Sequence, residues 1–170
     1  MSDNAIGVPS RKLDEFEELV YEYTARMGLG NGGHWDIDVR GSNLRFESAT
    51  RGPPATVSFL FTVTPGMSNF MGNLHGGCAA TLIDNLSTTI LLGVSKPGKF
   101  GFGGVSRNLR VTYLRPVPTG TEVRLVCEVI HVGRRLALLR AEIQKADSRE
   151  VCVVGEHEKA NTDPEDNQKI

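Results

Sequence analysis

The feature that most restricts the fold of this chain is one long apolar segment, Gly76 to Val94, with the pattern of a helix. Ala79, Ile83 and Leu86 lie on one stripe, and further leucines extend the apolar surface to the other sides. A helix that is apolar around most of its circumference is buried inside a protein. The rest of the chain must therefore supply a layer that covers it.

The neighbouring segments can supply that layer, because they show the two-residue alternation of strands. In residues 55–64, the apolar side chains of Val57, Phe59 and Phe61 occupy alternate positions. Short turns separate the later strands that we expect, which cover residues 105–114, 122–132, 134–144 and 151–160. An antiparallel sheet wrapped around a single apolar helix is an α+β architecture.

The N-terminal region is expected to add a second helix. Residues 11–27 place Leu13, Phe16 and Val20 on one helical stripe, and glycines follow it. Residues 34–50 then predict a strand or a hairpin arm, with its turn at 41–43. A chain of 170 residues suits one domain. We expect an N-terminal helical extension (1–33), the main domain (34–160) with a flexible loop at 96–104, and a polar, disordered tail (161–170).

The start of the central helix carries the residues that indicate chemistry. It opens with His75, Gly76 and Gly77. Backbone N–H groups at a helix start lack intrahelical acceptors and lie at the positive end of the helix dipole, and glycine lets a ligand approach them. Such groups stabilise a developing oxyanion. Asp84 follows at a position where a core helix would carry a hydrophobic residue, and a buried carboxylate is costly unless it is paired or functional. The combination indicates acyl chemistry.

Composition argues against several other classes of protein. The net charge of −1 gives no general attraction to nucleic acid or to an anionic membrane. No apolar run of about 18 residues is present, so we expect no membrane-spanning helix. The four histidines are scattered and the three cysteines lie far apart, so we expect no metal site. The N-terminus lacks the apolar core of a secretory signal, which favours the cytoplasm, with mitochondria as the alternative.

Several motifs, in this order, resemble those of the hot-dog-fold acyl-CoA thioesterases of the phenylacetate-pathway and thioesterase-superfamily-member type. They are Asn69, Gly72–Asp84 with its His-Gly-Gly triplet, Gly104–Ser106, Leu109–Tyr113, Gly133–Ala137 and Gly155–His157. The likeness covers about residues 55–160. It implies a hot-dog fold, a homo-oligomer, and hydrolysis of acyl-CoA to a carboxylic acid and CoA with no further cofactor.

The resemblance also implies a role for each matching residue. The N–H of Gly76 would polarise the thioester carbonyl, and Asp84 would act as general base or nucleophile. Asn69 would help to place the water or the thioester, and Ser106 would orient the water. His75 would shape the helix start and assist the carbonyl. The CoA portion would lie along Tyr113, Leu114, Arg115, Pro116, Gly133, Arg134, Arg135, Leu136 and His157.

The spacing of two of these residues adds a constraint. Gly76 and Asp84 are eight residues apart in the sequence. That separation is about 12 Å along a helix, so one chain cannot bring both to the same carbonyl. If both are catalytic, the site lies between two subunits of a dimer, alone or within a tetramer. Asp84 would act as a base if burial raised its pKa enough for proton transfer.

Each residue also has a purely structural interpretation. Asp84 can pair with Asn85 or an arginine, His75 fits a turn, and paired glycines allow tight helix–sheet packing. Asn69 is a common turn residue, Ser106 fits a strand end, and the two turn arginines are ordinary surface charges. Cys78 is three residues from His75 and could be a thiolate nucleophile, but we expect a buried, inert thiol.

Two other functions remain open. One is a hot-dog enoyl-CoA hydratase, which would use a His and a carboxylate as acid and base. The other is an acyl-CoA-binding sensor without catalytic activity. The joint presence of Asn69, Asp84 and Ser106 argues against the sensor, because holding a ligand requires no buried base.

Overall fold

The structure is a computed structural model that describes residues 6–7, 9–26, 39 and 41–164. Two α-helices and six strands are found in this part of the chain, with a short 3-10 helix at Pro65–Met67. Their bounds are α1 (Glu15–Arg26), β1 (Arg45–Thr50), β2 (Thr56–Thr62), α2 (Gly76–Gly93), β3 (Val105–Tyr113), β4 (Glu122–Val132), β5 (Leu136–Lys145) and β6 (Val151–Ala160).

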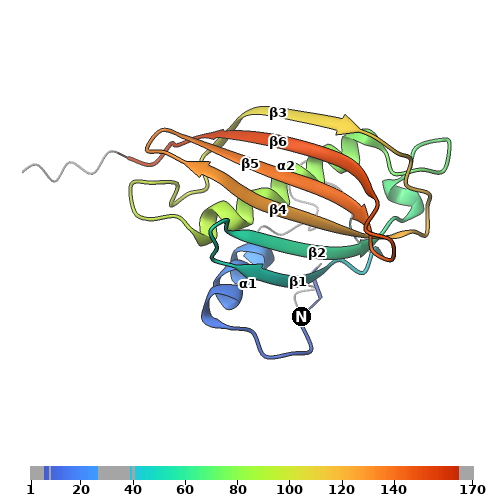
Figure 1. The fold of residues 1–170 in the computed structure, drawn as a ribbon, viewed down its shortest axis with the longest axis horizontal. Helices are drawn as coiled ribbons and strands as arrows, with labels where there is room; N and C mark the ends of the chain where they lie inside the picture. Colours follow the sequence, from blue (N-terminus) through green and yellow to red (C-terminus); the bar gives the residue numbers. More distant parts are fainter. Residues whose placement is uncertain (1–5, 8, 27–38, 40, 165–170) are drawn as a thin grey trace, which may run out of the picture.

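The six strands form one sheet in the order β1-β2-β4-β5-β6-β3, and every neighbouring pair is antiparallel. Helix α2 runs along one face of this sheet, and α1 lies beside β1 (Figure 1). Strand β3 is one edge of the sheet and β1 is the other. This arrangement confirms the predicted hot-dog fold, an antiparallel sheet around a long central helix with an extra N-terminal helix.

The core lies between α2 and the sheet, as the apolar pattern predicts. Ile83 and Leu86 of α2, Phe59 and Phe61 of β2, and Leu125 of β4 are fully buried. Burying a side chain of this size stabilises the folded state by about 1.5–3 kcal/mol. The central helix was therefore placed correctly from its apolar circumference alone.

Helix α1 begins at Glu15, later than the predicted residue 11. The Oδ1 of Asp14 accepts a hydrogen bond from the Glu17 N–H (2.8 Å), and the Glu17 carboxylate accepts one from the Asp14 N–H (3.2 Å). This reciprocal pair is a capping box, which fixes the helix start. The helix then packs against α2 at Gly93, where an added Cβ would lie 2.7 Å from Val20.

The prediction for residues 34–50 was only partly correct. The turn at 41–43 is present, but the strand covers only Arg45–Thr50. Of the remaining positions, 34–38 and 40 lie outside the described residues, as do the glycines at 28–33.

Two segments that were expected to be flexible are held in place by each other. The Phe100 side chain is fully buried, and its N–H donates to Asn161 Oδ1 (3.0 Å). Asn161 Nδ2 donates to the Gly98 carbonyl (2.9 Å), and the Asp163 carboxylate accepts from the N–H groups of residues 101 and 102. Hydrogen bonds therefore join the loop at 96–104 to residues 161–164. Residues 165–170 lie outside the described part.

Candidate active site

Asp84 of α2 meets two other polar side chains, Ser106 of β3 and His157 of β6. Its Oδ1 accepts a hydrogen bond from Ser106 Oγ (2.6 Å) and lies 3.1 Å from His157 Nε2. His157 Nε2 is also 2.9 Å from Ser106 Oγ. The register of β3 against β6 shifts between Ser106 and Asn108, and such an irregularity re-aims a side chain. We call Asp84, Ser106 and His157 the Asp84 cluster.

Further polar side chains form hydrogen bonds with this cluster, either directly or through Thr88. His157 is 1% exposed, and its Nδ1 lies 2.8 Å from Ser87 Oγ. Lys159, also buried, donates from Nζ to Thr88 Oγ1 (3.0 Å), and the Thr88 hydroxyl donates to the Asp84 carbonyl (2.8 Å). Sequence reasoning missed Ser87, Thr88 and Lys159. Their signal was the polar run Ser87–Thr89 one turn after Asp84, and the position of Lys159 on the same strand face as His157.

The pKa of Asp84 departs from its ordinary value in the direction opposite to the sequence expectation. The hydrogen bond from His157, together with that from Ser106, lowers the pKa from 3.8 to about 2, and these bonds outweigh the opposing effect of burial. The side chain is 39% exposed, so burial is incomplete. Asp84 is therefore an ionised carboxylate throughout the physiological pH range.

This lowered pKa predicts a pH-dependent contribution to stability. A carboxyl group whose pKa is lower in the folded than in the unfolded state stabilises the fold above its unfolded pKa, and this contribution disappears as the pH falls through the folded value. For Asp84 the loss should extend from about pH 4 down to about pH 2. In urea unfolding at fixed protein concentration, the gap in unfolding free energy between the wild type and Asp84→Asn should shrink between pH 6 and pH 3. An equal gap at both pH values would contradict this assignment.

The start of α2 forms a second group of candidate residues. His75 is the N-cap residue, and its Nδ1 accepts a hydrogen bond from the Gly77 N–H (3.0 Å). The Gly76 N–H is at the first helical position, where no intrahelical acceptor exists, and no other acceptor for it is found among the described residues. Tyr113 Oη donates to the Gly76 carbonyl (2.7 Å), and an added Cβ at Gly76 would lie 3.1 Å from that ring.

A cavity of about 470 Å³ lies beside this helix start. The predicted CoA-contacting residues 113–116 line it together with Gly76 and Asn69. Asn69 Oδ1 accepts from the N–H groups of Met71 (2.9 Å) and Asn73 (3.2 Å), which fixes the amide. Nδ2 of Asn69 makes no hydrogen bond with the described residues and remains a donor for a ligand. We call this the helix-start cavity.

One chain does not bring all the predicted residues together. The Asp84 cluster lies at the beginning of β3, whereas the helix-start cavity lies at the end of β3, at Tyr113. The turn at 133–136 also lies near the beginning of β3, because Leu136 and Val105 both pair with Ala160. The resemblance implied that His157 contacts CoA. In the structure His157 does not line the helix-start cavity and is buried beside Asp84.

Other catalytic chemistries find less support in the described residues. Burial raises the pKa of the Cys78 thiol to about 11, so a Cys78 thiolate is not available at neutral pH. In the part of the chain that the structure describes, no three metal-ligating side chains come together. No helix in the described ranges has the length and apolar character to cross a membrane.

The family model for the Thioesterase superfamily matches residues 71–152. The match includes Gly76, Asp84 and Ser106, whereas Asn69 and His157 lie outside it.

The chain is also similar to individual members of this superfamily. It is 33% identical over 92 residues to acyl-coenzyme A thioesterase 13 of Homo sapiens; the match covers 54% of this chain and 63% of the relative's length. Thioesterase superfamily member 2 of zebra fish superposes with a TM-score of 0.67 at 24% identity, covering 89% of this chain and 99% of the other. A Streptococcus pneumoniae thioesterase protein solved with coenzyme A superposes with a TM-score of 0.62 at 21% identity, covering 72% and 88%. The structural likenesses establish the hot-dog fold.

Proposed function

We propose that this protein hydrolyses acyl-CoA thioesters, and that each active site is shared between two copies of the chain. The observation that carries the proposal is the separation of two complementary half-sites along β3. An ionised carboxylate hydrogen-bonded to Ser106 lies at one end, and a backbone N–H beside a cavity lies at the other. The relative named acyl-coenzyme A thioesterase 13 and the thioesterase solved with coenzyme A favour an acyl-CoA substrate.

The edge position of β3 supports a shared site. Ser106 and Tyr113 are seven residues apart, which is about 23 Å along a strand. Among the described strands, β3 pairs only with β6, and Val105, Tyr113 and Leu114 near its ends are about half exposed. An unpaired edge with apolar side chains favours pairing with another strand. If β3 pairs antiparallel with β3 of a second copy, each Asp84 cluster meets the helix-start cavity of the other copy.

The same pairing would assemble the expected CoA groove. Residues 113–116 line the cavity at the end of β3, and the turn at 133–136 lies beside its beginning. Antiparallel pairing of two β3 strands places the end of one beside the beginning of the other. The two predicted CoA segments, which are apart in one chain, would then border one groove.

The proposed reaction follows from the charges of the two half-sites. Water attacks the thioester carbonyl while the Asp84 carboxylate accepts its proton, and the Gly76 N–H donates to the oxyanion that forms. Collapse of the tetrahedral intermediate breaks the C–S bond, and the CoA thiolate leaves and takes up a proton. A carboxylate with a pKa of about 2 is a weak base, so we expect proton transfer to accompany bond formation, when the attacking water becomes acidic.

The test is thiol release from a panel of acyl-CoAs, from acetyl to palmitoyl together with phenylacetyl, measured with DTNB. We expect hydrolysis of at least one member by the purified protein, and the best substrate would identify the acyl class. Binding of acyl-CoA without thiol release would contradict hydrolysis and favour the sensor. Hydration of an enoyl-CoA without release of CoA would favour the hydratase.

The turn arginines give a separate prediction about binding. Arg134 is exposed on the β4–β5 turn, at the end of the sheet where the groove would hold the CoA phosphates. Arg134→Ala should raise KM for acyl-CoA by more than it lowers kcat, because a phosphate contact contributes equally to substrate and transition state. Lys12→Ala, which removes an exposed charge on the α1 side, is the matched control. An unchanged KM in Arg134→Ala would contradict the phosphate assignment.

A further inference from the structure

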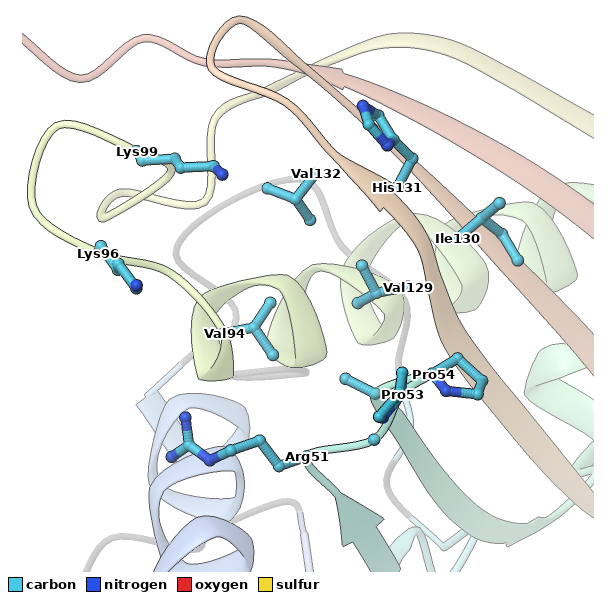
Figure 2. Close-up of a pocket in the computed structure, with 12 residues that line it drawn as sticks. Arg51, Pro53, Pro54, Val94, Lys96, Lys99, Val129, Ile130, His131 and Val132 are labelled. Carbon is cyan, nitrogen blue, oxygen red and sulfur yellow. The ribbon is translucent and has the colours of Figure 1, made fainter.

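A second cavity of about 450 Å³ lies between the end of α2 and the end of β4 (Figure 2). Its floor is apolar, formed by Val94 at the end of α2 and by Val129 and Val132 of β4. Figure 2 shows Lys96 and Lys99 on the loop that follows α2. The complete lining is Arg51, Gly52, Pro53, Pro54, Ala55, Val94, Lys96, Lys99, Val129, Ile130, His131 and Val132. We call this the basic cavity.

The charged groups that line this cavity are all positive. Arg51, Lys96 and Lys99 are cationic, His131 adds an imidazole ring, and no carboxylate is among the lining residues. Among the described residues, none of the three cations forms an ion pair with a carboxylate. The whole chain has a net charge of −1, so this concentration of positive charge is local. An unpaired positive cluster attracts an anion.

The cations are presented by fixed backbone. Lys96 and Lys99 exchange backbone hydrogen bonds of 3.1 and 2.9 Å, and the buried Phe100 with the Asn161 contacts anchors the loop behind them. The Arg51 guanidinium lies 4.6 Å from the centre of the Phe16 ring, in a cation–π contact. Since this backbone is already ordered, ligand binding would cost less conformational entropy than at a mobile loop.

The basic cavity is separate from both half-sites of the proposed active site. It lies where β2 meets β4, and β4 is separated from β3 by β5 and β6. Three strand spacings correspond to about 14 Å. Val94 also follows Asp84 by ten residues, about 15 Å along a helix. The lining residues of the basic cavity and of the helix-start cavity do not overlap.

We propose that the basic cavity binds a small organic anion with an aliphatic body. Lys96, Lys99 and Arg51 would hold a carboxylate or phosphate head, and the valines and prolines would cover the aliphatic body. Cavities that hold small molecules have volumes of about 300–1,000 Å³, are mostly apolar and carry a few placed polar groups. This site is independent of the proposed hydrolysis.

The test is binding of octanoate, octyl phosphate and the neutral octanol, followed by the valine methyl NMR signals of the full chain. We expect both anions to shift the signals of Val94, Val129 and Val132, with octanol at least tenfold weaker. A preference between the two anions identifies the head group. No shift at these methyls, or equal binding of octanol, would overturn the proposal.

Variants separate this site from the active site. Lys96→Glu combined with Lys99→Glu should weaken octanoate binding at least tenfold, whereas the matched charge change Lys12→Glu should leave it unchanged. If the double variant does not fold, Lys96→Gln alone and Arg51→Gln alone should each weaken binding severalfold. Unaltered affinity in the folded variants would contradict the proposal, as would displacement of octanoate from these methyls by CoA. Failure of thioester hydrolysis would leave this binding readout unaffected.

Discussion

Replacing Asp84 with asparagine is expected to lower kcat for acyl-CoA hydrolysis by about 10²-fold or more, in the range for losing a general base. Asparagine keeps the shape of the side chain and an oxygen that can accept from Ser106, but it cannot accept a proton from water. Thiol release with DTNB would measure the effect on the best acyl-CoA of the panel. The oligomeric state of the variant should match that of the wild type, and the variant should remain folded at the assay temperature despite the lower stability expected from the loss of the Asp84 charge.

A nearby carboxylate provides the matched control for this experiment. Glu158 is next to His157 on β6 and hydrogen-bonds to Arg107 and Asn108 instead of to the Asp84 cluster. Glu158→Gln makes the same chemical change a short distance away and should keep kcat within about twofold, as expected for an exposed surface ion pair. Near-normal turnover in a folded Asp84→Asn variant would show that Asp84 is not the base.

The main elements of the fold could be predicted from the sequence because their signals are local. The apolar circumference of α2 and the alternation in β2 depend on neighbours two to four positions away, and both were found where the pattern indicated. The bounds of β4 and β6 agreed with prediction for the same reason. The contacts of the loop at 96–104 could not be predicted, because its partner Asn161 lies more than sixty positions from Gly98 and Phe100.

The same distinction between local signals and distant contacts applies to the candidate site. The helix start and Asp84 could be selected from residue type and spacing, whereas the pKa of Asp84 could not be. Its direction depends on His157, a residue 73 positions later that the folded sheet brings within 3.1 Å. The resemblance placed His157 near the substrate, but nothing local in the sequence indicated that it would face Asp84.

The proposal of a shared site has a test of its own, which uses two variants with complementary defects. Gly76→Pro removes the N–H that would bind the oxyanion, and proline is tolerated at the first position of a helix. The preceding residue, His75, already has the extended backbone that proline requires. Gly76→Ala adds a Cβ and keeps the N–H, so it is the matched control. Loss of one such donor should lower kcat by about 10²–10³-fold relative to that control.

Co-expression of Gly76→Pro and Asp84→Asn in equal amounts should restore activity. If each site takes Asp84 from one copy and Gly76 from the other, half of the dimers are mixed and one of their two sites is intact. The preparation should then recover about a quarter of the wild-type activity, far above either variant alone. If both residues acted within one chain, every site would carry a defect and the mixture would stay inactive. Recovery therefore distinguishes the shared site from a site within one chain, because the 12 Å spacing along α2 leaves no other arrangement in which both residues serve one carbonyl.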